Sequence, residues 1–420
     1  MSKKSKFRLK KSHNRVVLIK NFIFLMLLQI MRYFIPILVL PYITRIIGVV
    51  HFGEISVAIS TCMIMQIIVD YGFNFLGTRE VATHKKDLKF ISYLYSAITC
   101  ARCLLFIICS IIMMAVTFFI PYMAEIRLLI FICLFPVFFS IFMPEWMYQG
   151  LEEMEFITYI HVISRIIYVI LIFTLIKQEN DYILYPIFNL IGLLFASVAS
   201  LIILRRKQIK LHLVSYKTCR KFFKDAKDLF INEVCGSLLS HLSNIMVGTF
   251  LSFRDAGIYT SSGKLIVGIN HGQKMIHRVF YPFLAQHGNK FKNYFYINLI
   301  ISIIVSSLTF AFTPLIYSIF YPNEFSEGIK VMQIAAIGLL FNGISGSLSS
   351  NYLIVRKKER VVRNISIFIL MFGSILFITA MLRFGLIGAA VAAMCNNFIR
   401  FLLLAYFCYR YRKMKLAFRK

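Results

Sequence analysis

The chain has 420 residues, of which 59% are hydrophobic and only 15% are charged, yet its formal net charge is +29. In a soluble protein such a charge would favour a nucleic-acid partner. Here most basic residues lie in the gaps between long apolar runs. This distribution argues against nucleic acid and predicts an all-α protein that crosses a membrane many times.

Apolar runs of bilayer length recur from the beginning of the chain to its end. A helix that crosses a bilayer needs ~20 predominantly apolar residues. The runs therefore predict twelve transmembrane helices. They are expected at residues 21–46, 55–77, 91–119, 128–146, 156–176, 182–204, 230–251, 257–280, 294–317, 331–354, 365–382 and 386–409.

Basic residues are concentrated in every second gap between these helices. Six segments hold 36 of the 47 Lys and Arg residues, whereas the six gaps on the opposite side of the membrane hold one each, namely Arg45, Arg127, Lys177, Arg254, Lys330 and Arg383. The basic segments are 1–20, 78–90, 205–229, 274–293, 355–364 and 410–420. Cytoplasmic loops carry an excess of Lys and Arg, so both termini are expected in the cytoplasm. The inner loop 147–155 departs from the rule, because it has three Glu residues and no basic residue.

The longest internal gap divides the predicted helices into two sets of six. We expect an N-terminal six-helix bundle at 1–204, a basic cytoplasmic linker at 205–229 and a C-terminal six-helix bundle at 230–420. The linker is interpreted either as an amphipathic helix on the inner leaflet or as a solvated connection. Residues 51–56 and 255–260 are similar entries to the second helix of each half, which favours a transporter built from structural repeats.

Two regions of the predicted helices are candidates for a moving gate and for the lining of a water-filled cavity. The first helix contains Pro36 and Pro41, which predict a bend that is either a moving gate or a static kink. The seventh and eighth helices, 230–251 and 257–280, are the most polar. Because polar groups in hydrocarbon are costly, these two helices are expected to line a cavity.

Outside the basic segments and the opposite gaps, five basic residues fall within predicted helices. Arg400 is close enough to the cytoplasmic end to reach the surface, and Arg32, Arg102, Arg165 and Lys264 lie at membrane depth. Ionisable residues there are functional candidates, and arginine can grip phosphate oxygens with two hydrogen bonds. We therefore predict that these residues contact an anionic substrate. The alternative is that each one pairs with a carboxylate or a carbonyl of the protein.

Further polar residues of the helices complete the predicted site. Asn270 and His271, next to each other in the eighth helix, are predicted to contact the substrate. Asp70, Glu145 and His241 are predicted to couple transport to protons or ions. The alternative for the two acids is a structural pairing with Arg79 and its neighbours, and for His241 a hydrogen-bonded packing role.

The chain carries none of the catalytic motifs GxSxG, HExxH or GxxxxGK[ST]. Each of these motifs supplies chemistry that a hydrolase, a metalloprotease or an ATP-driven pump requires. We therefore expect a protein that is not an enzyme and that needs no cofactor and no metal ion.

Four segments resemble one known family of membrane proteins. Residues 40–48 (LPYITRIIG), 70–74 (DYGFN), 78–82 (TREVA) and 144–154 (PEWMYQGLEEM) are similar to motifs of the Wzx-type O-antigen flippases. These belong to the multidrug/oligosaccharidyl-lipid/polysaccharide exporter superfamily. Together with looser similarity at 257–259, the resemblance covers about residues 40–285.

The resemblance implies a fold, a location and a substrate. The expected fold is two six-helix bundles around a central cavity that opens alternately to either side of the bacterial inner membrane. The expected substrate is an oligosaccharide repeat unit on undecaprenyl diphosphate, which moves from the cytoplasmic to the periplasmic leaflet. A polysaccharide polymerase and a chain-length regulator are the expected partners.

Three other functions are considered. A multidrug or cation antiporter of the same superfamily would carry acidic residues in mid-membrane, where this chain is basic. A membrane-embedded O-antigen polymerase or ligase would need a sizeable periplasmic loop, which the predicted topology lacks. A flippase for peptidoglycan precursors shares the fold and the cargo chemistry, and only the motif at 70–82 favours the O-antigen type.

Overall fold

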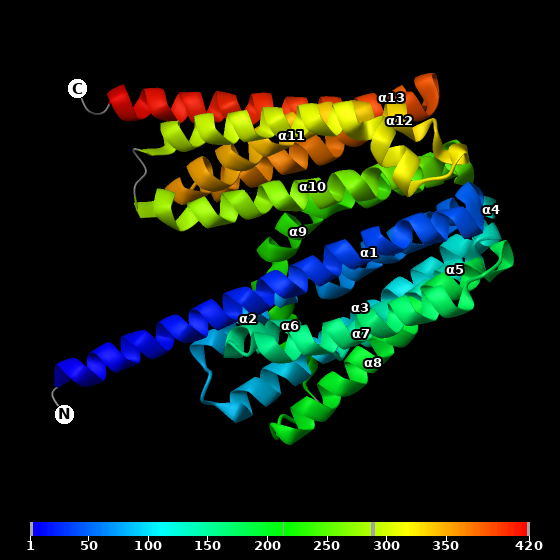
Figure 1. Cartoon of the computed structure of the whole chain (residues 1–420). Coiled ribbons are helices and arrows are strands. Elements are labelled where there is room, and N and C mark those ends of the chain that lie inside the picture. Colours follow the sequence, from blue (N-terminus) through cyan, green and yellow to red (C-terminus); the bar gives the residue numbers. More distant parts are fainter. Residues whose placement is uncertain (1–2, 213, 287–289, 418–420) are drawn as a thin grey trace. The chain divides into compact units, whose positions relative to one another are not determined.

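The computed structural model describes residues 3–212, 214–286 and 290–417, and within these ranges the chain folds into helices without any strand. Figure 1 shows the helices joined by short connections. The α-helices are α1 (Lys3–Asp70), α2 (Phe73–Thr83), α3 (Leu88–Phe119), α4 (Pro121–Glu125), α5 (Arg127–Ile141), α6 (Glu145–Leu151), α7 (Met154–Leu175), α8 (Leu184–Arg206), α9 (Tyr216–Phe250), α10 (Phe253–Gln286), α11 (Phe291–Phe320), α12 (Gly328–Gly346) and α13 (Glu359–Ala417). A π-helix (Ser347–Leu353) continues α12.

Eight helical stretches of the described chain are long and apolar enough to cross a membrane. Two of them, with 58 and 53 residues, are long enough for two crossings each. Helical backbone angles break inside α1 at Gly48 (φ 71°) and inside α13 at Gly385 (φ 60°), in the gaps predicted between helices. The all-α, multi-pass membrane fold is confirmed, and the number of twelve crossings stays a prediction.

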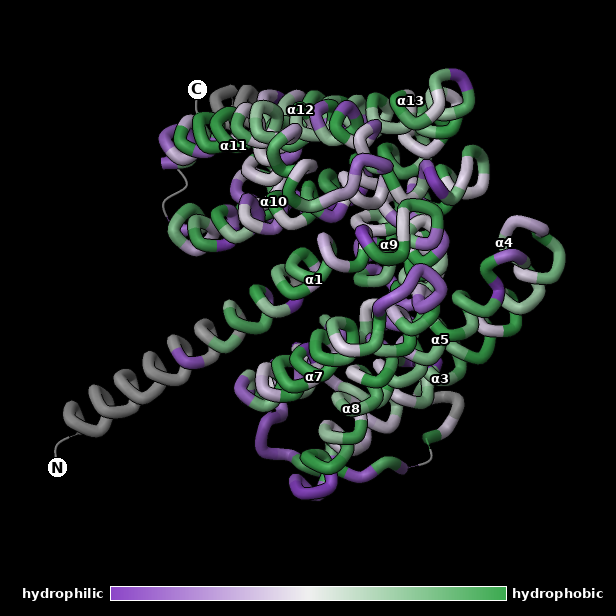
Figure 2. The backbone as a smooth tube through the Cα atoms, turned by 45° about the vertical axis from the view of Figure 1, so that its right-hand side comes forward, coloured by the Kyte–Doolittle hydropathy of each residue, from purple (hydrophilic) through white to green (hydrophobic). Residues whose placement is uncertain are grey.

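The helices α9 and α10 are absent from those eight stretches, although they have 35 and 34 residues. Their polar content lowers their hydropathy, as their sequences predicted. Elsewhere large apolar side chains point outward, for example Ile111 (65% exposed) on α3 and Met371 (67% exposed) on α13. Figure 2 shows hydrophobic residues along α3, α5, α7 and α8, with hydrophilic residues at their connections. Exposed side chains of this kind suit a lipid surrounding.

The chain forms two compact units that are interleaved in sequence. The first unit is Met1–Val39 with Thr61–Val234, and the second is Leu40–Ser60 with Cys235–Lys420. The middle of α1 therefore packs with the C-terminal half of the chain. Whether 1–204 and 230–420 act as two lobes stays a prediction.

The end of the predicted linker is a helix that packs against protein. From Tyr216 onward the chain is part of α9, which continues into the predicted seventh membrane helix without a break. Phe222 and Ala226 are 8% and 0% exposed and join the core of the first unit, whereas Lys221 and Lys224 are exposed. The interpretation as a fully solvated connection is wrong for this part, because its apolar face is covered by the first unit.

The two segments that were predicted as equivalent helix entries lie against each other in the second unit. A Cβ atom on Gly53 would lie 1.8 Å from the carbonyl oxygen of Phe253. In turn, a Cβ atom on Gly257 would lie 2.3 Å from the carbonyl oxygen of Val49. Gly53 thus faces the carbonyl group of the residue four positions before Gly257, and Gly257 faces the carbonyl group of the residue four positions before Gly53. This reciprocal contact supports the hypothesis of an internal structural repeat.

Two of the four segments that carry the family resemblance, 78–82 and 144–154, pack together in the first unit. A Cβ atom on Gly77 of α2 would lie 2.4 Å from Cε3 of Trp146 on α6, and Thr78 Oγ1 donates a hydrogen bond to the Trp146 carbonyl oxygen (3.2 Å). On the other side, a Cβ atom on Gly150 would lie 2.6 Å from Cβ of Val81. Small residues are needed at both positions because the two short helices approach so closely.

We expect Gly77→Ala to lower the thermal unfolding temperature, because its methyl group would overlap the buried indole of Trp146. Overpacking of this kind costs about 1–3 kcal/mol. The matched control is Gly236→Ala on α9, where a Cβ atom would meet nothing within 4 Å. Trp146 is the single tryptophan, so intrinsic fluorescence reports unfolding directly. Equal unfolding temperatures for both variants would contradict this packing.

Candidate functional site

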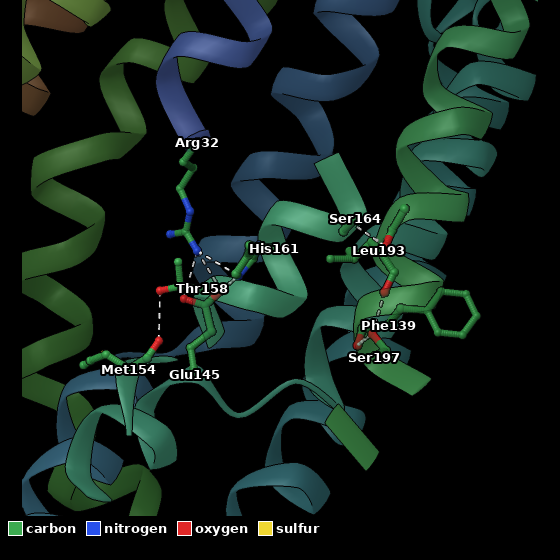
Figure 3. A network of polar contacts seen from close by, with 10 residues as sticks. Arg32, Phe139, Glu145, Met154, Thr158, His161, Ser164, Leu193 and Ser197 are labelled. Carbon is green, nitrogen blue, oxygen red and sulfur yellow. Dashed lines mark hydrogen bonds and ion pairs between the residues drawn. The ribbon is translucent and has the colours of Figure 1, made fainter. Parts of the chain in front are cut away.

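Arg32, Glu145 and His161 form an ion-paired network in the first unit (Figure 3). Arg32 Nη2 on α1 donates to Glu145 Oε1 (2.8 Å) and Oε2 (2.9 Å), at the first turn of α6. His161 Nε2 on α7 lies 2.9 Å from Glu145 Oε1 and 3.3 Å from Arg32 Nη2. Helix α1 thus meets the consecutive helices α6 and α7, more than a hundred residues away in sequence, around one carboxylate.

This network is partly open to its surroundings. The side chains of Arg32, Glu145 and His161 are 36%, 27% and 12% exposed. Beside it, Thr158 Oγ1 donates to the Met154 carbonyl (2.9 Å) and to the Phe24 carbonyl (3.1 Å), which ties α7 to α1. A guanidinium held by a carboxylate in an accessible position can exchange that carboxylate for another anion.

Arg102 lies in a second, fully buried arrangement. Its side chain is 3% exposed, and Nη2 lies 3.0 Å from Asp70 Oδ1 and 2.8 Å from Asn74 Oδ1. Asp70 ends α1, and a turn through Tyr71 (φ 43°) and Gly72 (φ 73°) leads into α2. Arg102 therefore fixes the turn of the DYGFN motif. This geometry supports the alternative of a structural role for Arg102.

The expected pairing of the two acids with Arg79 is wrong. Arg79 Nη2 lies 3.1 Å from Glu80 Oε1, the carboxylate of its neighbour in sequence. Asp70 pairs with Arg102 and Glu145 with Arg32, so both partners come from the candidate basic residues at depth. Burying an unpaired charge is costly, which explains why these acids are matched inside the helix bundle.

Arg165 has a neutral partner. Its Nη1 donates to Asn189 Oδ1 on α8 (3.1 Å), and its guanidinium carbon lies 5.6 Å from the ring centre of Tyr168. Within the described ranges no carboxylate lies at ion-pair distance from Arg165. Arg165 follows His161 by four residues on α7, so both side chains lie on the same face of that helix.

Lys264, on α10 in the second unit, also lacks a carboxylate partner among the residues that the structure describes. Its Nζ lies 4.4 Å from the ring centre of Phe52, which is 1% exposed and packs edge-on against Phe325. His271 follows Lys264 by seven residues and shares its helix face. Asn270 accepts a hydrogen bond from Asn342 Nδ2 (3.0 Å) on α12.

Several polar residues of α9 and α10 are bound by each other or by neighbouring helices of the second unit. Asn244 is 6% exposed; its Nδ2 donates to the Ser56 carbonyl (3.0 Å) and to Ser60 Oγ (2.7 Å), and its Oδ1 accepts from Thr260 (2.5 Å). Ser262 is 1% exposed, and its Oγ lies 2.5 Å from the phenol oxygen (Oη) of Tyr317 on α11. His241 is half-buried on α9. The cavity-lining hypothesis therefore rests on the remaining polar positions, such as Lys264.

Sequence reasoning brought Arg32 and Glu145 into the candidate set separately, and the structure joins them. It missed His161, which contacts Arg32 and Glu145, and Asn189, which accepts a hydrogen bond from Arg165. The spacing of four residues between His161 and Arg165 was the available signal. Arg32 and Lys264 belong to different compact units, so their contribution to one shared cavity stays a prediction.

The chain matches the family described as "Polysaccharide biosynthesis protein" over residues 18–288, which is more than half of its length. The chain belongs to this family. A second family with the same description matches residues 286–420. The membership confirms the family that the motifs of α2 and α6 predicted.

Individual relatives of this polysaccharide biosynthesis protein agree with the family match. A Shigella dysenteriae protein described as "Putative O-antigen transporter" is 24% identical over 354 residues, 83% of this chain and 89% of that protein. A protein of Escherichia coli (strain K12) with the same description is 23% identical over 270 residues, 64% of this chain and 65% of the relative. The resemblance to O-antigen flippases is thereby confirmed.

Solved structures share the fold of this family member. The lipid II flippase MurJ in an inward closed conformation has a TM-score of 0.74 at 16% identity, covering 92% of this chain and 87% of MurJ. An inward-facing multidrug resistance MATE transporter of the MOP superfamily has a TM-score of 0.65 at 12% identity, covering 90% and 98%. These likenesses show the polytopic all-α fold.

Proposed function

We propose that this protein is a flippase for a lipid-linked oligosaccharide, the O-antigen or a related polysaccharide repeat unit on undecaprenyl diphosphate. It moves this lipid from the cytoplasmic to the periplasmic leaflet by alternating access and makes or breaks no bond. The relatives described as O-antigen transporters and the fold shared with MurJ support the proposal. Proton or sodium counter-flow and the membrane potential are the candidate driving forces.

One observation carries the proposal: the charges at membrane depth leave a surplus of cations. Of the three acids within the predicted helices, Asp70 and Glu145 each pair with an arginine and Glu233 lies near the start of the seventh helix, whereas Arg165 and Lys264 have no carboxylate partner within the described ranges. A diphosphate cannot cross hydrocarbon unaided, because desolvating its charge is prohibitive. Cationic side chains at depth compensate that cost and favour an anionic cargo.

Arg32 is proposed as the first residue that binds the diphosphate of the cargo. In the structure both carboxylate oxygens of Glu145 accept hydrogen bonds from the Arg32 guanidinium. A diphosphate also offers pairs of neighbouring oxygen acceptors and carries more negative charge, so it can take the place of this carboxylate. His161 then remains as the partner of Glu145. The ion pair thus keeps Arg32 charged and positioned while no cargo is bound.

The membrane and the partners follow from the same proposal. The alternating basic segments support a location in the bacterial inner membrane with both termini in the cytoplasm. A polysaccharide polymerase that uses the flipped units and a chain-length regulator are the proposed partners. The rival function, an antiporter for cationic drugs, would favour an excess of acidic residues at membrane depth, whereas basic residues outnumber acidic ones within the predicted helices.

The proposal is tested by surface glycan display in a host that carries the polysaccharide gene cluster of the source organism, with and without this gene. Loss of surface polymer with single lipid-linked repeat units left on the cytoplasmic face is the expected result. Unchanged display with altered drug sensitivity would instead support the antiporter. Units that reach the periplasmic face and stay unpolymerised would mean that the protein is a polymerase.

Lys264→Ala is expected to reduce glycan display about tenfold. This factor corresponds to the loss of one charge-assisted contact of ~1.4 kcal/mol. Lys264→Arg should retain display. Because Lys264 lies over an aromatic ring and pairs with no carboxylate among the residues that the structure describes, its removal should leave the amount of protein in the membrane unchanged. The matched control is Lys292→Ala, another lysine over an aromatic ring (Tyr296, 6.0 Å) but exposed. Equal display in both alanine variants would contradict a role for Lys264.

A further inference from the structure

A shallow apolar groove runs between α3 and α5 in the first unit. Its volume is about 200 Å³, and its walls include Phe106, Ile107, Ile111, Met114, Phe131 and Leu134. Ile107 and Ile111 are 56% and 65% exposed, so the groove opens onto the surface that would face lipid. The volume is smaller than the ~300–1,000 Å³ of sites that enclose a whole drug-sized ligand. A groove of this size fits a segment of a single chain.

The groove has the length of one membrane leaflet. On α3 its lining runs from Phe106 to Thr117, near the end of that helix at Phe119. At 1.5 Å per residue this stretch is roughly 17 Å long, close to half of the ~30 Å hydrocarbon thickness of a bilayer. The alternation of basic segments places this end of α3 on the periplasmic side. The groove therefore follows the depth of the outer leaflet.

A cation lies at the outer end of the groove. Arg127, the only basic residue of the segment 120–127, begins α5. Its Nη2 donates to the carbonyl oxygen of Thr117 (3.2 Å), and its guanidinium carbon lies 4.5 Å from the ring centre of Phe118. Its buried Nε has no hydrogen-bond partner, and no carboxylate of the described chain pairs with it.

We propose that the groove binds the polyprenyl chain of the lipid-linked cargo after it has reached the outer leaflet, while Arg127 binds its diphosphate. This inference rests on the proposed flippase function and assigns a site to the lipid part of the same cargo. The combination of an apolar groove with a guanidinium at its outer end that has no carboxylate partner in the described chain matches a single-chain lipid with a phosphate head. A phospholipid, with two chains, fits the groove less well.

The apolar walls alone do not select the occupant. Inside a bilayer there is no hydrophobic driving force, because lipid tails are as apolar as the groove. Selection therefore comes from close van der Waals packing along the branched and aromatic walls, together with the charge-assisted contact at Arg127. Both parts of the site are needed for a preference over the surrounding lipid.

The test is photo-crosslinking of the full-length protein in vesicles of phosphatidylethanolamine and phosphatidylglycerol that contain undecaprenyl diphosphate. p-Benzoylphenylalanine replaces Ile107 in the groove, or Leu308 on α11 as a control of nearly equal exposure (52%). Mass spectrometry identifies the attached lipid. We expect undecaprenyl diphosphate to be enriched about tenfold at position 107 over position 308, as one charge-assisted contact predicts.

Arg127→Gln should abolish this enrichment, whereas Arg127→Lys should keep part of it, because lysine retains the charge without the two-pronged geometry. Phospholipid adducts alone at position 107, in a protein that still translocates lipid-linked repeat units in the same vesicles, would overturn the groove proposal. A wild-type protein that translocates no repeat units would overturn the proposed function, whatever the crosslinks show. Enrichment that survives Arg127→Gln would overturn the part assigned to Arg127.

Discussion

Arg32→Ala is expected to block transport and to weaken binding of undecaprenyl diphosphate, while Glu145→Gln is expected to tighten that binding. In the structure Glu145 occupies the guanidinium of Arg32 with both oxygens, at 2.8 and 2.9 Å. Removing the Arg32 side chain removes the guanidinium that is proposed to bind the diphosphate. Neutralising Glu145 removes only the competitor of the phosphate, so the two changes should act in opposite directions.

The expected change in binding free energy is that of one charge-assisted pair of hydrogen bonds, ~1.5–3 kcal/mol. This corresponds to a change in Kd of roughly 10- to 150-fold. Arg32→Lys should give an intermediate result, because lysine keeps the charge and loses the fork. The measurement is equilibrium binding of undecaprenyl diphosphate to each purified variant. If both Arg32→Ala and Glu145→Gln weaken binding and lower the unfolding temperature alike, the ion pair is structural and the proposed grip is wrong.

Arg102→Ala should lower the amount of folded protein far more than Lys264→Ala, because it leaves Asp70 buried without its counter-charge. Breaking a buried ion pair at one partner costs about 3–5 kcal/mol, a large part of the ~5–15 kcal/mol that stabilises a typical protein. Asn74 would lose its donor as well. The unfolding temperature, followed by the fluorescence of Trp146, and the protein level in the membrane measure this effect.

The double variant Asp70→Asn/Arg102→Met separates a structural role from a substrate contact. It removes both charges and keeps apolar volume in place of the arginine stem, so it should recover a large part of the lost stability. Transport should return with the folded protein, since the geometry assigns Arg102 to the turn after α1. A double variant that folds with the wild-type unfolding temperature but transports nothing would show that Arg102 contacts the cargo.

The membrane helices were predictable because hydrocarbon imposes a strict demand on length and polarity. The predicted gaps 47–54 and 383–385 contain Gly48 and Gly385, where helical angles break. The continuity of α9 through the end of the basic linker was not predictable in this way. It depends on the core of the first unit, which covers the apolar face formed by Phe222 and Ala226.

The partners within the candidate site were less accessible to sequence reasoning. Arg32 and Glu145 are separated by 113 residues and Arg32 and His161 by 129, so no local pattern joins them. Each residue could be recognised as a charge or a polar group at depth, but the choice of partner depends on which helices pack side by side. The reciprocal glycines Gly53 and Gly257, by contrast, were visible in the sequence as two similar entries.

The central claim is that this family member moves a lipid-linked anion across the bilayer by means of cations at depth. Its most direct test is translocation of an undecaprenyl-diphosphate-linked repeat unit in vesicles that contain only the purified protein, followed with a lectin or glycosidase that reaches one leaflet. We expect wild-type protein to make the initially protected pool accessible, and the Arg32→Ala variant to leave it protected. An accessible pool that does not depend on wild-type protein, or equal rates for the folded Arg32→Ala variant, would contradict the account.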